Sequence, residues 1–125
     1  MTLVISAQDI QSATFGLVKD QALFCEESFA IPPEQYLSSL DTFLRAQNVA
    51  PGDITSVFVV NGPGSFTASR VSVVLANTVA FVQNCPVRTI ANPDRMPLSE
   101  LVLSFLNLPD QVFAVPSYDR PPNIT

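Results

Sequence analysis

The most informative part of the sequence runs from Val57 to Thr67 and reads VFVVNGPGSFT. Its first four residues form an unbroken apolar run, which is typical of a strand buried on both faces of a sheet. The Asn-Gly-Pro-Gly segment that follows predicts a tight loop. Ser65 and Thr67 then supply residue types that favour the N-cap of a helix. We therefore expect a central strand, a short loop and a helix that continues to about Phe81.

This expected helix is apolar on two opposite sides when its residues are placed about 100° apart. One side carries the larger residues Val71, Leu75, Val79 and Val82. The opposite side carries Ser69, Val73, Ala76 and Ala80. We expect the first side to cover the sheet and the second, with its small residues, to let a partner helix approach closely. The alternative is a helix inside a three-layer core, for which so small a chain has little material.

The segments on either side of this region complete the expected order of elements. Strands are expected at 3–5, 12–18, 21–29 and 87–90, helices at about 33–48 and 98–106, and a last apolar segment at 112–115. Three strands, a helix, a strand, a helix and a strand is the order of the ribonuclease-H-like unit of actin-like ATPase folds. Short crossovers favour parallel pairing of the fourth strand beside the first. The predicted fold is α/β, with helices packed on a mixed five-stranded sheet.

Composition limits the kinds of function. The chain has 125 residues, which suits a single domain, and its 47% hydrophobic and 14% charged content points to an apolar partner-binding surface. The net charge is -5 and the six basic residues are scattered, which argues against direct binding of nucleic acid. The absence of histidine excludes Ser-His-Asp and Cys-His catalysis and the usual zinc and iron ligand sets. We therefore expect neither an enzyme nor a bound cofactor or metal.

The N-terminal residues and the two cysteines bear on location. The stretch MTLVISAQD has no basic start and no long apolar run, so we expect no signal peptide, no membrane span and a cytoplasmic protein. Cys25 and Cys85 lie far apart in the sequence, and without an export signal we interpret them as reduced thiols.

Residues 59–71, VVNGPGSFTASRV, resemble the hallmark of the TsaB family, a buried strand that leads into GPGSFTGLRI. Seven residues, Gly62 through Thr67 and Arg70, stand as in that pattern. Two weaker likenesses flank it: PEQYL at 33–37 falls where the family has HSERL, and VPSYDRP at 115–121 resembles its Pro-x-Tyr-Leu-Arg C-terminal arm. The resemblance implies a ribonuclease-H-like first subdomain at 1–91, then a short helix and Pro-rich arm at 92–125, without most of the second subdomain.

The sequence departs from this family at positions that matter for chemistry and for packing. The family commonly has Asp-Thr-Ser after its first strand, whereas this chain has Ser6-Ala7-Gln8 and so lacks the carboxylate. Proline, in the pair Pro32-Pro33, takes the place of the histidine of the first-helix motif, and Ala68 and Ser72 replace two glycines of the second helix. These changes disfavour an ATPase role and should alter how closely a partner helix packs.

The resemblance implies a non-catalytic scaffold in the synthesis of N6-threonylcarbamoyladenosine (t6A) on tRNA. In that role the chain would bind and stabilise the catalytic subunit TsaD, and a TsaE-like ATPase is a candidate further component. We expect the first-subdomain helices to form the interface, through Tyr36, Leu40, Ser69, Arg70, Val73, Ala76, Asn77 and Ala80. For Arg70, a solvated surface position is an equally good interpretation.

Three other hypotheses remain open. One is that the same face pairs two copies of the chain instead. The loop Gly62, Pro63, Gly64, Ser65, Phe66, Thr67 could hold a nucleotide phosphate, although it has no Walker lysine, Pro63 has no N–H, and a simple tight turn is favoured. Ser65 could act as an acyl-transfer nucleophile, but the sequence offers no histidine to activate it.

Overall fold

The computed structural model describes residues 1–105. The expected apolar segment at 112–115 and the C-terminal arm lie outside these residues. Within the described part the order of strands and helices agrees with the prediction.

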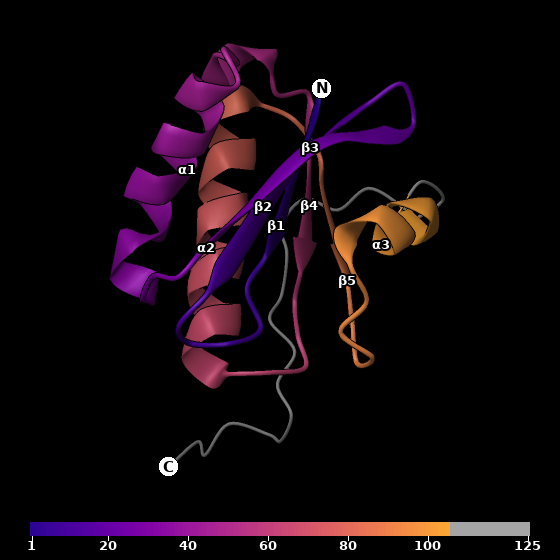
Figure 1. Cartoon of the computed structure of the whole chain (residues 1–125). Coiled ribbons are helices and arrows are strands. Elements are labelled where there is room, and N and C mark those ends of the chain that lie inside the picture. Colours follow the sequence, from indigo (N-terminus) through magenta and orange to yellow (C-terminus); the bar gives the residue numbers. More distant parts are fainter. Residues whose placement is uncertain (106–125) are drawn as a thin grey trace.

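A single five-stranded sheet forms the centre of the molecule (Figure 1). Its strands are β1 (Thr2–Ser6), β2 (Ala13–Lys19), β3 (Ala22–Phe29), β4 (Ser56–Val60) and β5 (Val87–Ile90). They lie in the order β3-β2-β1-β4-β5. The first three pair antiparallel, whereas β4 pairs parallel with both β1 and β5. The mixed sheet and the parallel pairing of the fourth strand beside the first are confirmed.

Helices cover both faces of this sheet (Figure 1). On one face lie α1 (Tyr36–Ala46), which follows a short 3-10 turn at Pro33–Gln35, and the longer α2 (Phe66–Gln83). On the other face lies α3 (Leu98–Phe105). A second 3-10 turn, Pro51–Asp53, connects α1 to β4. No helix within residues 1–105 is both long and apolar enough to span a membrane.

The strand β4 contributes to two hydrophobic cores. Val57 and Val59 pack into the larger core beneath α1 and α2, whereas Phe58 and Val60 pack into a smaller core beneath α3. All four side chains are buried, so the expectation of a strand buried on both faces is confirmed.

The helix α3 packs closely on the sheet at Gly16 in β2. A Cβ atom at this position would lie 3.0 Å from Cδ1 of Leu98 and 3.2 Å from Cδ1 of Leu23. Leu98, Leu101 and Val102 are buried in the smaller core. Residues Leu98, Leu101 and Val102 of α3 therefore pack on the sheet that residues 1–91 form.

The residues at the two ends of α2 determine where the helix begins and where it ends. The Ser65 hydroxyl accepts a hydrogen bond from the Ala68 N–H at 3.2 Å and so caps the helix. Thr67 lies inside the first turn with its side chain exposed, so the expectation that it also acts as a cap is wrong. Asn84 ends the helix in the left-handed conformation, with φ of 52°.

Candidate functional site

The structure places six of the eight expected partner-binding residues inside the molecule. Only Arg70 is exposed, and Asn77 is half-buried. The six buried side chains are Tyr36, Leu40, Ser69, Val73, Ala76 and Ala80. The expectation that the small-residue side of α2 is displayed to a partner is therefore wrong.

The packing of α2 on the sheet explains this correction. Ala76 and Ala80 share the larger core with Val57 and Val59 of β4, so the small side chains face the strands. Small residues let a helix lie close to a sheet whose own surface is built from branched side chains. The side with larger residues is turned instead toward α1, where Val79 packs against the core.

A different set of apolar residues is exposed on this helical layer. We call it the outer face and define it by Leu37 of α1 and Val74, Phe81 and Val82 of α2. Phe81 has 87% of its surface exposed, and Leu37 has 67%. Val74 and Phe81 are separated by two helical turns and so lie on the same side of α2. Exposed apolar side chains that gather on one side of a molecule, unlike single ones, mark surfaces where proteins associate.

A groove between α1 and α2 adjoins the outer face. Its volume is about 200 Å³, below the range of about 300–1,000 Å³ of small-molecule pockets. Asp41, Thr78 and Gln83 contribute polar groups to its lining. The apolar lining consists of Leu37, Leu40, Leu44, Pro51, Ile54, Val79 and Val82. A groove of this size and composition suits an apolar side chain of a protein partner better than a cofactor.

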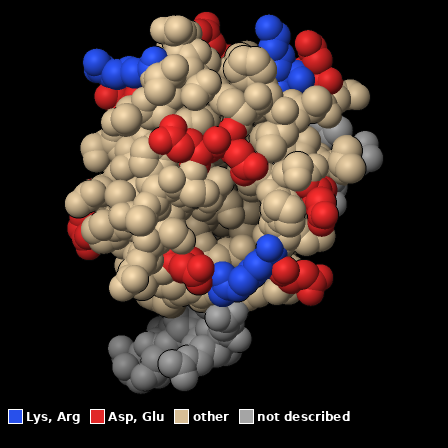
Figure 2. All heavy atoms as spheres, in the orientation of Figure 1, with Lys and Arg blue, Asp and Glu red and all other residues tan. Residues whose placement is uncertain are grey.

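Few charged side chains line the groove, since Asp41 is the only charged one among the described residues that line it. In Figure 2, Asp and Glu side chains gather near the middle of the face shown, whereas the Lys and Arg side chains lie nearer its edges. Asp41 and Arg45 of α1 form an i,i+4 ion pair, at 2.9 Å and exposed to solvent. No basic patch of the kind that phosphate contacts require is visible on this face of the described residues.

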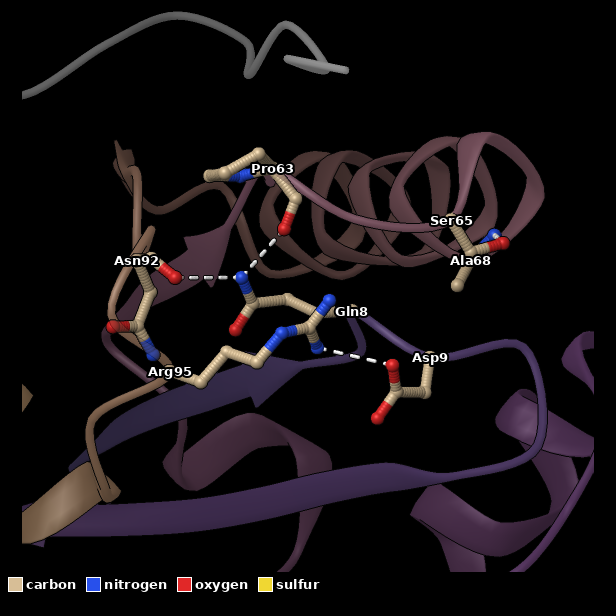
Figure 3. A network of polar contacts seen from close by, with 7 residues as sticks. All are labelled: Gln8, Asp9, Pro63, Ser65, Ala68, Asn92 and Arg95. Carbon is tan, nitrogen blue, oxygen red and sulfur yellow. Dashed lines mark hydrogen bonds and ion pairs between the residues drawn. The ribbon is translucent and has the colours of Figure 1, made fainter. Parts of the chain in front are cut away.

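The motif loop belongs to a second cluster, at the carboxyl ends of β1, β4 and β5. Figure 3 shows the Gln8 side chain between the loops that contain Pro63 and Asn92. Gln8 Nε2 donates to the carbonyl oxygens of Pro63 at 2.6 Å and of Asn92 at 2.8 Å. The Ser65 N–H donates to the Gln8 main-chain oxygen at 2.7 Å. Gln8 thus joins three loops that are distant in sequence.

Side-chain contacts of Asn92 and Arg95 complete this cluster. The Asn92 amide bonds the backbone of Met96 in both directions, at 2.9 and 3.0 Å. Arg95 forms an exposed ion pair with Asp9 at 3.0 Å (Figure 3). Sequence analysis missed Gln8 and Asn92 as partners of the motif loop, and it missed the ion pair between Arg95 and Asp9. The Asn92-Pro93 dipeptide, a turn signal, was the one local indication.

The geometry of the motif loop suits a structural turn. A Cβ atom at Gly64 would lie 2.5 Å from the Gln8 carbonyl oxygen, so the close approach of the two loops requires glycine. Pro63 has no N–H, the Ser65 N–H is engaged by Gln8, and the Ser65 hydroxyl caps α2. Phe66 and Thr67 begin α2 and are exposed. These contacts disfavour an anion site or an activated serine here.

Two polar groups are buried inside the helical layer. Among residues 1–105, Tyr36 Oη and Ser69 Oγ find no hydrogen-bond partner. Burial, together with the negative charges of Asp9 and Glu34, raises the pKa of Tyr36 to about 12. Burial also raises the pKa of both free cysteines, Cys25 and Cys85. These groups are therefore neutral near pH 7.

Comparison with known proteins identifies the family. Residues 33–98 match the model of the family described as TsaD: tRNA N6-adenosine threonylcarbamoyltransferase. The tRNA threonylcarbamoyladenosine biosynthesis protein TsaB of Bacillus subtilis (strain 168) is 30% identical over 99 residues, which cover 72% of this chain and 42% of that protein. The chain thus spans about two fifths of the length of this relative.

Solved structures show the same fold. One is YeaZ from Pseudomonas aeruginosa, and another is a crystal structure of an uncharacterized protein with similarity to peptidase YeaZ from the same organism. Each matches with a TM-score of 0.64 and 19% identity, over 73% of this chain and 43% of the other. The fold is thus the ribonuclease-H-like α/β fold of the actin-like ATPase class. Since the family model spans more than half of the sequence, the chain belongs to the TsaD family, as a protein of the TsaB type.

Proposed function

We propose that this chain is a non-catalytic subunit of the t6A synthesis machinery, which binds and stabilises a TsaD-type catalytic subunit. The observation that carries the proposal is the outer face of α1 and α2 with its adjoining apolar groove. A cytoplasmic location accompanies this role.

The outer face has the features of a protein interface. Apolar patches with polar rims mark surfaces where proteins associate. Exposed aromatic side chains often contribute most of the binding energy, and Phe81 is the most exposed large apolar residue of the described chain. The groove, which Leu37 and Val82 of the outer face line, offers a pocket for an apolar side chain from the partner.

The chemistry of the chain supports a binding role over catalysis. The sequence has no histidine, and the hydroxyl of Ser65 in the motif loop caps a helix. Within residues 1–105, no three His, Cys, Asp or Glu side chains lie close enough to hold a metal ion together. In this proposal the partner carries the reactive groups, and a TsaE-like ATPase joins only through the complex.

Co-expression with the TsaD-type protein of the same organism tests the proposal. Affinity capture through a tag on the TsaD-type protein should recover wild-type chain in stoichiometric amount. Leu37→Asp should abolish recovery, because it places a charge on the outer face. Leu103→Asp is the matched control: Leu103 of α3 is 70% exposed, against 67% for Leu37, and lies across the sheet. It should be recovered like wild type.

The same samples separate the alternatives. Equal recovery of the two variants would exclude the outer face as the interface, and failure to recover wild-type chain would exclude a TsaD-type partner. Light scattering on the free chain then tests self-association. A wild-type dimer that Leu37→Asp converts to a monomer would assign the outer face to homodimerisation instead.

A further inference from the structure

The loops at 7–12, 61–65 and 91–97 meet at the carboxyl ends of three strands that pair in parallel, β1, β4 and β5. This edge is where α/β sheets usually bind their ligands. In this chain the Gln8 side chain, only 8% exposed, lies between two of the loops (Figure 3).

The side-chain nitrogen of Gln8 lies between two main-chain carbonyl oxygens. The carbonyl oxygens of Pro63 and Asn92 both accept from Nε2, at 2.6 and 2.8 Å. A primary amide carries two protons, so these two bonds use both. Without a hydrogen-bond donor between them, the partly buried Pro63 oxygen and the buried Asn92 oxygen would lose hydration with nothing in exchange.

We propose that the Gln8 amide does at this edge what a bound cation would do: it joins the loops at 61–65 and 91–97 by standing between their carbonyl oxygens. The chain thereby closes the edge from within and needs no ligand or metal there. Two main-chain bonds complete the closure, from Ser65 N–H to the Gln8 oxygen and from Asn92 N–H to the Gly62 oxygen.

This inference is independent of the docking proposal. Gln8 contacts the loop that begins α2, whereas the outer face lies further along that helix and on α1. A variant at position 8 therefore tests the closure by stability alone, with no TsaD-type partner present. Failure of either proposal leaves the other standing.

The decisive substitution is Gln8→Asp, measured by thermal unfolding in EDTA and in millimolar CaCl2. The carboxylate has no proton to donate and repels both carbonyl oxygens, so Tm in EDTA should fall by more than about 5 °C. Aspartate is one methylene shorter than glutamine, which leaves room for a cation at the place of Nε2. Calcium prefers carboxylate and carbonyl oxygens, so CaCl2 should restore most of the lost Tm. Wild-type Tm should be the same in both solutions.

Two control variants test whether the effects on Tm depend on a carboxylate at position 8. Gln8→Ala removes the amide without adding a ligand, so its lower Tm should not respond to calcium. Gln11→Asp adds the same charge at an exposed position of the same loop and should change Tm by less than about 2 °C in either solution. Should Gln8→Asp fail to fold in EDTA, refolding in CaCl2 replaces the Tm measurement, and recovery of the native fold supports the proposal.

Three results would overturn the closure. One is a rise in wild-type Tm with CaCl2 or MgCl2, which would mean that the edge takes a cation already. The second is an unchanged Tm of Gln8→Asp in EDTA. The third is a Gln8→Asp variant whose Tm, or whose refolding, calcium does not improve.

Discussion

The inner and outer surfaces of the α1–α2 layer are both apolar, yet they differ in exposure and, along α2, in the size of their side chains. The inner surface of α2 carries Ala76 and Ala80 against the sheet, whereas its outer surface carries Phe81, almost fully exposed. In α1, adjacent residues belong to different surfaces: Tyr36 is buried, whereas Leu37 is 67% exposed.

The comparison shows that side-chain volume, more than hydrophobicity, determines which side of α2 meets the sheet. A helix close to a β-sheet leaves little room between the backbones, so alanine and serine fit there and phenylalanine does not. The larger residues are then left to pack against a neighbouring helix or to remain in solvent. A large apolar residue left in solvent is a candidate for contact with a partner.

The largest expected effect comes from placing the same charge on the two surfaces. Ala76→Arg buries an unpaired guanidinium in the larger core and should destabilise the fold by more than about 4 kcal/mol, enough to unfold most of the protein. Val74→Arg adds that charge on the outer face and should change the free energy of unfolding by less than about 0.5 kcal/mol. Urea unfolding followed by circular dichroism measures both. Similar losses in the two variants would contradict the assignment of the surfaces.

The free energy of unfolding should depend on pH through Tyr36, whose side chain is buried on the inner surface of the α1–α2 layer. The pKa of Tyr36 is about 12 in the folded protein and near 10 when unfolded, so its neutral form stabilises the fold fully below pH 10. That contribution is lost as pH rises from about 10 to 12, because only the unfolded state releases the proton readily. Tyr36→Phe should have nearly wild-type stability at pH 7, since Tyr36 Oη has no partner.

Chemical denaturation of both proteins between pH 9 and pH 12 provides the test. Wild type should lose more stability than Tyr36→Phe over this range. Parallel curves would show that the Tyr36 hydroxyl is hydrated in the folded state.

The secondary structure was predictable because it depends on local patterns. The apolar run at 57–60 and the turn residues that follow it locate β4 and the start of α2, and the order of elements then leads to the sheet topology. Ser65 followed the preference of helix N-caps for serine. Its neighbour Thr67 has the same preference, and periodicity alone does not show which of the two lies outside the helix.

The candidate sites were less predictable because they depend on packing between distant segments. Both apolar sides of α2 have the same period, so only the distance to the sheet determines that Ala76 lies inside. Gln8 is remote in sequence from Pro63 and Asn92, by 55 and 84 residues. Nothing in the local sequence indicates that one amide connects them. Phe81 is a typical core residue by type, and its exposure became evident only in the structure.

Titration calorimetry of the purified chain against the TsaD-type subunit tests the central claim most directly, with Phe81→Ser compared with wild type. Phe24→Ser, at an exposed aromatic residue of β3, is the control. If Phe81 is a main contact of the outer face, its loss should raise Kd by about 30-fold or more while Phe24→Ser leaves Kd unchanged. Wild-type affinity in a folded Phe81→Ser variant would contradict the account.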